Sequence, residues 1–445
     1  MNTPICDFVK KYAESGKVKL HMPGHKGTSF LGLEKFDITE IDGADSLYEA
    51  SGIIAQSEKN ASELFSCKTF YSTEGSSQCI KAMVHLLSLD AKNRGKIPYI
   101  WAGRNAHKAF HSAIALLDID VDWIYPSEMD SYLSCNIDAD ELSLMLKGAE
   151  KKPSAIYITS PDYLGNVADV EAIARVCKEN DVLLAVDNAH GAYLKFLQSS
   201  KHPIDLGADI CCDSAHKTLP VFTGGAYLHL SHSFGEKFND KCVKDAMLLF
   251  GSTSPSYIIL QSLDMANAYL ENYALSLCGF AKKVKLVKNA LTDNGYELYG
   301  GEVLKITVCA KNYGYEGYEL KDILLQNGVV CEFCDRDFVV MMLTPEISDE
   351  DLKKLCDIML SIPKRDAIKD KSPSFVALKK GMSLRDAMLS NSECIPLEKS
   401  LGRVVAISNI GCPPAVPIAV AGEIIDQNVI ECLKYYKITE INVVK

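Results

Sequence analysis

Lys217 and Asp187 are the two residues of this chain whose types and surroundings most strongly suggest chemistry. Lys217 lies in the segment DSAHKTLP at 213–220, and Asp187 ends the apolar run VLLAV at 182–186. A lysine that loses its proton can hold an aldehyde as a Schiff base, and a buried carboxylate can keep a pyridine nitrogen protonated. Separately, the acid could begin a turn and the lysine could be a solvated charge. Together they favour a site for pyridoxal 5'-phosphate (PLP).

One histidine lies close in sequence to each of these two residues, and another follows a third predicted strand. His190 and His216 are close in sequence to the acid and the lysine, so they are candidates for hydrogen bonding or proton transfer. His107, in RNAHKAFH at 104–111, could stack on the pyridine ring. It or its neighbour His111 could equally be an ordinary surface residue, so the pattern leaves the histidine roles open.

A phosphate site is predicted at the segment STEGSS, residues 72–77, which follows a strand and opens a helix. Free backbone N–H groups and serine hydroxyls converge at such a helix start. An ordinary serine cap is the alternative. Asp162 lies in TSPDYLG at 159–165, which either passes beside the cofactor or forms a plain turn.

The elements around these residues predict an α/β protein. Apolar strands alternate with helical periodicity, which indicates a mainly parallel seven-stranded sheet whose functional residues follow the carboxyl ends of strands. The expected strands are 69–72, 99–102, 121–125, 155–159, 183–187, 210–213 and 226–230.

The chain is long enough for more than one domain. We expect an irregular N-terminal arm at 1–50 and a large domain at 51–270. A connector helix, part of a helical stretch at 255–294, and a small α+β domain fill 271–362. A charged, proline-bounded linker then leads into a C-terminal α+β segment at 363–445.

Composition excludes several classes of function. The 445 residues carry a net charge of −11 and no Lys/Arg-rich run, which argues against nucleic-acid binding. The N-terminus lacks a signal-peptide pattern, and prolines interrupt the uncharged run 404–422, so no membrane span is expected. Sixteen cysteines without a disulfide rhythm predict reduced thiols and a cytoplasmic location. The lone CxxC at 331–334 favours strand cysteines, and no metal is expected.

The chain resembles the Orn/Lys/Arg decarboxylase family of fold-type I PLP-dependent enzymes, whose large domain is aspartate aminotransferase-like. It is similar to the short form that lacks an N-terminal response-regulator-like domain. The motifs that carry the resemblance are HMPGHKG at 21–27, DITEIDG at 37–43, RNAHK at 104–108, TSP at 159–161, DNAHG at 187–191, SAHKTLP at 214–220, STSPSY at 252–257, and CPPAVP at 412–417 with Gly422-Glu423.

The resemblance implies a role for each matching residue. Lys217 is the Schiff-base lysine, Asp187 the pyridinium partner and His107 the ring-stacking group, while His216 or Lys217 donates a proton to the product. Gly75, Ser76 and Ser214 are expected to hold the phosphate, with Ser252 or Thr253 reaching in from a second subunit. From their positions in the sequence alone, Ser77 and His190 are also expected to bind the cofactor. The family also implies a homodimer or higher homo-oligomer with active sites at the interface.

Four parts of the sequence depart from the family pattern. Glu74-Gly75-Ser76 replaces Asn-Gly-Thr, Asn188 replaces Glu, Tyr48 replaces His, and Cys412-Pro413-Pro414-Ala415 replaces Tyr-Pro-Pro-Gly. None of them removes the lysine or the acid, so they bear on substrate choice more than on cofactor binding.

The predicted reaction is decarboxylation of a basic amino acid, arginine first and then lysine or ornithine, giving an amine of polyamine biosynthesis. An acid should read the distal end of this substrate. Glu423 and Asp162 are the principal candidates, with Asp45 and Glu74 also possible.

Two alternatives stay open. An aminotransferase or Cβ-lyase on the same fold would need an arginine for the α-carboxylate, and a non-catalytic scaffold is more distant. The late arginines are Arg336, Arg365, Arg385 and Arg403, of which Arg403 could instead pair with Glu423.

Overall fold

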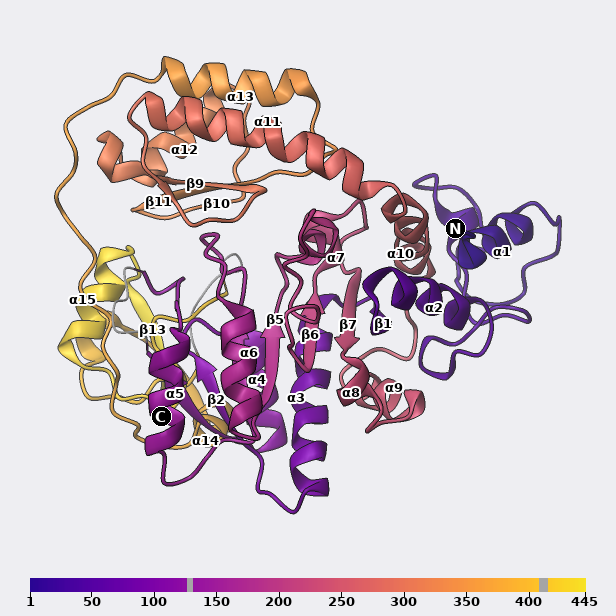
Figure 1. Ribbon diagram of the computed structural model, residues 1–445, viewed down its shortest axis with the longest axis horizontal. Coiled ribbons are helices and arrows are strands. Elements are labelled where there is room, and N and C mark those ends of the chain that lie inside the picture. Colours follow the sequence, from indigo (N-terminus) through magenta and orange to yellow (C-terminus); the bar gives the residue numbers. More distant parts are fainter. Residues whose placement is uncertain (126–130, 408–414) are drawn as a thin grey trace. The chain divides into compact units, whose positions relative to one another are not determined.

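The computed structural model describes residues 1–125, 131–407 and 415–445 (Figure 1). Residues 412–414 of the predicted motif at 412–417 therefore lie outside the described residues. The chain forms two compact units. The first contains Met1–Pro98, Lys152–Tyr157 and Val170–Leu277, and the second contains Tyr99–Lys151, Ile158–Asp169 and Cys278–Lys445. The domain boundaries expected at 50, 270 and 362 stay a prediction.

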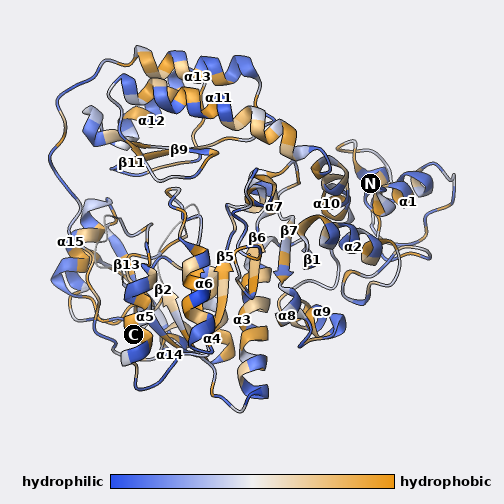
Figure 2. Ribbon diagram, in the orientation of Figure 1, coloured by the Kyte–Doolittle hydropathy of each residue, from blue (hydrophilic) through white to orange (hydrophobic). Residues whose placement is uncertain are grey.

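The principal sheet has seven strands in the order β1-β7-β6-β5-β4-β2-β3, which confirms the predicted α/β fold with a mostly parallel sheet. The apolar strands β5 and β6 lie side by side in parallel (Figures 1 and 2). Their register places Asp187 opposite Cys212. The strands are β1 (Lys68–Ser72), β2 (Tyr99–Gly103), β3 (Asp120–Ile124), β4 (Ala155–Thr159), β5 (Leu183–Asp187), β6 (Ile210–Asp213) and β7 (Ala226–Leu230).

Strand β7 runs antiparallel to both β1 and β6. A parallel strand needs a crossover of a dozen or more residues, usually through a full helix. The connection from β6 to β7 contains only the four-residue helix α7 (Ala215–Thr218), so the chain turns back beside β6. This turn carries Lys217.

The N-terminal arm is not irregular throughout, because α1 occupies Pro4–Ala13. Proline starts a helix without losing a needed hydrogen bond, and the buried Ile5 and Val9 are one turn apart. The other helices of the first unit are η1 (Glu34–Phe36), η2 (Leu47–Glu49), α2 (Ile53–Phe65), α3 (Gly75–Asn93), α6 (Val170–Glu179), η3 (Ala192–Phe196), α8 (His232–Gly235), α9 (Asp240–Leu248) and α10 (Tyr257–Leu270).

The long helical stretch expected at 255–294 is two helices, α10 and α11 (Tyr273–Asp293). The interruption falls at Glu271 and Asn272. Asparagine is a poor interior helix residue because its amide competes with backbone hydrogen bonds. The N–H of Leu275 bonds to the carbonyl of Asn272, where the second helix begins.

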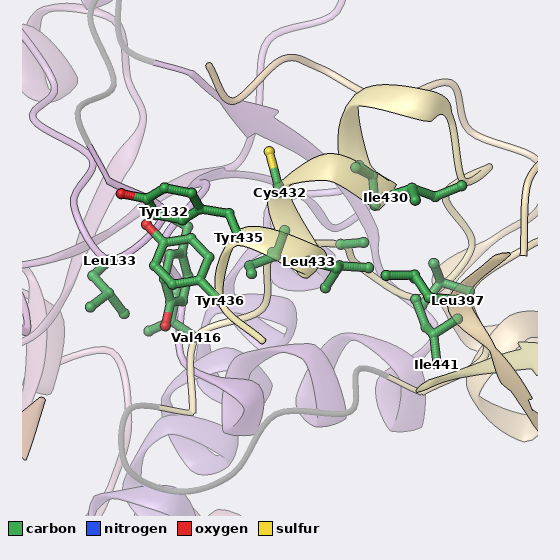
Figure 3. Packing of buried hydrophobic residues seen from close by; sticks show 14 of the residues in the cluster. Tyr132, Leu133, Leu397, Val416, Ile430, Cys432, Leu433, Tyr435, Tyr436 and Ile441 are labelled. Carbon is green, nitrogen blue, oxygen red and sulfur yellow. The ribbon is translucent and has the colours of Figure 1, made fainter. Parts of the chain in front are cut away.

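The second unit has its own apolar core, in which Tyr132, Tyr435 and Tyr436 pack together and Leu397 lies near Ile441 (Figure 3). It contains the four-stranded sheet β10-β11-β9-β8 and the pair β12-β13. Its strands are β8 (Leu298–Tyr299), β9 (Lys305–Cys309), β10 (Phe333–Cys334), β11 (Phe338–Met342), β12 (Ser392–Pro396) and β13 (Glu440–Val444). Its other helices are α4 (Lys108–Leu117), α5 (Ala139–Gly148), η4 (Ala310–Tyr313), α12 (Gly317–Gln326), α13 (Asp349–Ser361), α14 (Leu384–Leu389), η5 (Leu397–Lys399) and α15 (Gln427–Tyr435).

Candidate active site

Lys217 and His190 meet in the first unit. Lys217 is on α7, four residues after β6, and His190 is three residues after β5. Because these strands are parallel neighbours, both residues lie at the same edge of the sheet, and Lys217 Nζ is 3.0 Å from His190 Nε2. His190 is buried and Lys217 is half-buried. An imidazole in this position can accept a proton from the lysine, or share one with it.

Asp187 is buried at the end of β5. Its Oδ2 accepts a hydrogen bond from Tyr157 Oη at 3.1 Å, and its Oδ1 accepts the N–H of Ala189 at 3.2 Å and the thiol of Cys212 at 3.7 Å. Burial raises the pKa of the Asp187 carboxyl, and the nearby Lys217 opposes that rise. A second cation beside Asp187 would therefore be stabilised by this carboxylate.

Sequence reasoning missed Tyr157 and Cys212. Both lie inside apolar strands, where a tyrosine or cysteine is normally a packing residue. Strand pairing decides the contact of Cys212, because it is the register partner of Asp187. The polar tip of Tyr157 within the run AIYIT was the available signal.

The predicted phosphate residues gather at the start of α3. Gly75 has a positive φ of 72° and donates its N–H to the carbonyl of Gly224 at 2.7 Å. Ser214 Oγ donates to Ser76 Oγ at 2.7 Å, which joins the start of α3 to the segment before Lys217. The first-turn N–H groups of a helix have no acceptor within that helix, so this end suits an anion.

Close packing holds this corner in shape. A Cβ on Gly224 would lie 2.8 Å from the carbonyl oxygen of Thr73. The exposed Glu74, at the N-cap of α3, accepts the N–H of Ser252. Thr253, predicted to come from a second subunit, is exposed in the structure.

These donors and acceptors fit PLP. The amine of Lys217 matches its aldehyde, the buried carboxylate of Asp187 matches a protonated pyridine nitrogen, and the start of α3 with Ser76 and Ser214 matches its phosphate. All the residues that would contact the cofactor in this way belong to the first unit.

His216 lies beside Lys217, and one nitrogen of its ring contacts the backbone. Its Nδ1 is 3.0 Å from the carbonyl oxygen of Gly225, so Nδ1 carries the proton and donates it. This bond fixes the ring orientation and directs Nε2 as the acceptor or proton-transfer atom.

The structure places His107 in the second unit, at the N-cap of α4. Its Nδ1 accepts the N–H of Ala109 at 3.1 Å, which leaves the other ring nitrogen to donate. Burial and the neighbouring Arg104 lower the pKa of His111 to about 3, so that imidazole is neutral. His111 is therefore a buried residue and not a surface one.

Glu423 and Asp162 also belong to the second unit, and both carboxylates have partners there. Glu423 Oε2 is 3.2 Å from Arg104 Nη2 and accepts the N–H of Val420 at 2.7 Å. Asp162 accepts the N–H groups of Leu164 and Asn166, each at 2.9 Å. Their predicted contact with a substrate stays a prediction.

Asp45, another candidate acid, has a structural role. Its carboxylate accepts the N–H groups of Gly52 and Ile54, each at 2.8 Å, and so caps the start of α2. This is the ordinary role of an aspartate at a helix N-terminus.

The four late arginines all have acidic partners. The possible pairing of Arg403 with Glu423 is wrong, because Arg403 contacts Glu393 at 2.8 Å. The other pairs are Arg336 with Glu316 and Asp370, Arg365 with Glu319, and Arg385 with Asp118.

A buried cluster of possible metal ligands lies in the first unit. Ligand atoms of His202, Cys211 and Asp213 are all within 4.8 Å of one another. Asp213 Oδ2 lies 3.2 Å from His202 Nε2 and from His229 Nε2, which are hydrogen-bond distances. The sequence did not suggest this cluster, because His202 lies 11 residues before Asp213 and the three residues form no recognised metal-ligand spacing.

Residues 3–292 match the family described as "Orn/Lys/Arg decarboxylase, major domain". The chain therefore belongs to this family of PLP-dependent enzymes and is an amino-acid decarboxylase. The aminotransferase alternative is not favoured.

Relatives match along nearly the whole chain. The arginine decarboxylase of Bacillus subtilis (strain 168) is 28% identical over 464 residues, covering 96% of this chain and 91% of the relative. An uncharacterized protein of the same organism, YaaO, is 28% identical and covers 97% of this chain and 94% of its own length.

Solved structures show the same fold at low identity. Lysine decarboxylase A from Pseudomonas aeruginosa has a TM-score of 0.81 at 16% identity, covering 99% of this chain and 80% of that one. The Francisella novicida lysine decarboxylase LdcF has a TM-score of 0.80 at 16% identity, covering 100% and 81%. Among the described residues, no helix has the length and apolar character needed to cross a membrane.

Proposed function

We propose that this protein is a PLP-dependent decarboxylase of a basic amino acid, with arginine as the first candidate substrate. The observation that carries the proposal is the pairing of Lys217 with His190 at 3.0 Å, beside the buried carboxylate of Asp187. Family membership supports the reaction class.

PLP, when bound, supplies an electron-withdrawing ring that accepts the electrons left when CO2 departs. The protein's residues prepare for that step. Lys217 holds the cofactor covalently, and His190 stabilises the lysine Nζ in its unprotonated form. Asp187 keeps the proton on the pyridine nitrogen, while Tyr157 and the Ala189 N–H orient its two oxygens.

The phosphate residues anchor the opposite end of the cofactor. Gly75, Ser76, Ser77, Ser214 and, from a partner subunit, Thr253 are the proposed ligands. His107 is proposed to stack on the ring. Lys217 or His216 would then return a proton to the substrate carbon after CO2 leaves, and the fixed Nδ1–H of His216 makes its Nε2 the transfer atom.

Arginine is the preferred substrate because several relatives that cover more than nine-tenths of the chain are named arginine decarboxylases. Lysine and ornithine follow. A guanidinium or ammonium needs an acid at the far end of the pocket. Glu423 and Asp162 remain the proposed acids, although either would have to exchange a present partner for the substrate.

The biological setting follows from the same chemistry. The amine product would enter polyamine biosynthesis, and the enzyme would be cytoplasmic, which suits the free cysteines of the described chain. We propose a homodimer, because the N-terminal arm exposes large apolar side chains: Val18, Leu20, Phe30 and Leu31. Light scattering of the purified protein measures the assembly.

The test is to purify the protein with PLP, record the absorption of the bound cofactor, and measure CO2 released from arginine, lysine and ornithine separately. Lys217→Ala should lose the lysine-bound absorption and all CO2 release. Lys201→Ala, a change of an exposed lysine in the same unit, is the matched control and should keep both. Bound PLP without CO2 from any of the three substrates would contradict the proposal.

A further inference from the structure

Asn188 and Asp213 join the two segments that carry the candidate site. Asn188 directly follows Asp187, and Asp213 lies four residues before Lys217. Both side chains are buried, and Asn188 Nδ2 donates to Asp213 Oδ1 at 2.6 Å. The N–H of Asn188 also donates to the carbonyl of Cys212 at 3.0 Å. The end of β5 is thus tied to the end of β6 by both a backbone and a side-chain bond.

The other oxygen of Asp213 faces two buried histidines. Its Oδ2 is 3.2 Å from His202 Nε2 and 3.2 Å from His229 Nε2, and His229 Nδ1 is 2.9 Å from Thr69 Oγ1. These contacts give both carboxylate oxygens N–H donors. A buried carboxylate with donors on both oxygens is a strong, directional acceptor for Asn188.

Tight packing fixes Asn188 in this orientation. A Cβ on Gly191 would lie 2.0 Å from Asn188 Oδ1, so the loop after β5 closes around the amide. The N–H of Gly191 donates to the carbonyl of Asn188 at 2.7 Å. His190 lies inside this turn, so the position of Asn188 decides where His190 meets Lys217.

We propose that the Asn188–Asp213 pair is a positioning clamp that holds Asp187, His190 and Lys217 in the arrangement that receives PLP. The inference rests on the proposed cofactor site. The clamp acts through the backbone and touches neither the cofactor nor the substrate. The clamp needs one amide and one carboxylate. Two carboxylates would repel each other at the 2.6 Å that separates Asn188 Nδ2 from Asp213 Oδ1.

This requirement gives a physical reason for one departure from the family pattern. The resembling motif has Glu where this chain has Asn188. With Asp213 opposite, an acid at 188 would place two buried carboxylates in contact, whereas the amide provides the N–H that Asp213 needs.

The test exchanges the two groups. Asn188→Asp should weaken PLP binding about tenfold or more, since one carboxylate must be protonated or displaced. Asp213→Asn should have a smaller effect, because the oxygen of the new amide can still accept the N–H of Asn188 Nδ2 and no second carboxylate is introduced. The double variant Asn188→Asp/Asp213→Asn restores one acid and one amide. It should bind PLP within about threefold of the wild type.

Affinity is measured by titrating apo-protein with PLP and following the absorption of the lysine-bound cofactor. Thermal unfolding of each apo-protein separates loss of fold from loss of positioning. The proposal is overturned if Asn188→Asp binds PLP like the wild type, or if Asp213→Asn fails to rescue it. It is also overturned if the purified wild type contains one equivalent of metal that Asp213→Asn abolishes, because Asp213 would then be a metal ligand. Failure of the wild type itself to bind PLP would instead overturn the proposed function.

Discussion

Asp213 in the first unit and Asp335 in the second are both buried carboxylates, but their pKa values are shifted in opposite directions. Burial disfavours the charge of Asp213, yet His202 and His229 hold its pKa well below the usual range. Burial raises the pKa of Asp335 to about 7, and the N–H groups of Phe338 and Asp337 only partly oppose that rise.

The difference lies in the hydrogen-bond donors that contact each carboxylate oxygen. Asn188 and two histidines face the two oxygens of Asp213. Asp335 Oδ1 accepts two backbone N–H groups, but its Oδ2 has no hydrogen-bond partner within the described part of the chain. Burial alone therefore does not predict whether an acid is ionised, because donors on both oxygens can outweigh the loss of water.

A buried acid paired with a guanidinium extends the comparison and should show the largest effect on stability. Glu423→Gln leaves Arg104 buried without its acidic partner, which we expect to lower the free energy of unfolding by about 3 kcal/mol. Urea denaturation measures the change. Glu393→Gln breaks the more exposed pair with Arg403 and should cost less than about 1 kcal/mol. Equal losses from both variants would contradict the role assigned to burial.

Asp187 is a buried acid that is proposed to pair with the protonated pyridine nitrogen of PLP. Its charge should therefore matter more for catalysis than for folding. Asp187→Asn should reduce kcat by about 100-fold or more, since the pyridine nitrogen loses the carboxylate that keeps it protonated. Steady-state decarboxylation assays on the PLP-loaded enzyme test this. Tyr157→Phe removes one hydrogen bond to the same carboxylate and should cost only several-fold. Activity of Asp187→Asn at the wild-type level would exclude Asp187 as the cofactor partner.

Asp335 should make stability depend on pH. Its pKa of about 7 in the folded protein exceeds the ordinary value in the unfolded chain, so the folded state binds the extra proton at intermediate pH. The stabilisation is present at low pH and is lost as pH rises toward 7, by at most about 1.4 kcal/mol per pH unit. Asp335→Asn should therefore gain stability relative to the wild type by about 2–3 kcal/mol between pH 5 and pH 8.

Urea denaturation at the two pH values provides this measurement. The exposed Asp357, changed to Asn in the same unit, is the control and should produce no such gain. A wild-type to Asp335→Asn difference that is constant across pH would show that Asp335 does not titrate in this range.

Glu74 is exposed, and the smallest effect is expected there. Its carboxylate lies at the N-cap of α3, where the phosphate of PLP is proposed to bind. Glu74→Gln keeps an acceptor for the Ser252 N–H but removes a like charge, so PLP affinity should rise about two- to fivefold at low ionic strength. The gain should shrink in high salt. A loss of affinity would mean that the Glu74 charge organises the segment at Ser252.

Sequence by itself determined the elements that repeat in a simple pattern. The apolar runs predict the strands, and the position of Asp187 and Lys217 after two such runs predicts that they share one sheet edge, as the parallel pairing of β5 and β6 requires. The break between α10 and α11 was missed because one short signal competes weakly with a continuous helical pattern. The helix α1 was missed because the breaker-rich segment at 21–27 favoured an irregular arm.

Only the tertiary structure decided which polar groups meet. Asn188 and Asp213 are 25 residues apart, and Arg104 and Glu423 are 319 apart, yet each pair forms a buried contact. No periodicity encodes such a pairing, since it depends on strand register and on which loops close together. The sequence therefore identified the residue types available for cofactor chemistry, while the fold selected the partners that set their charge and position.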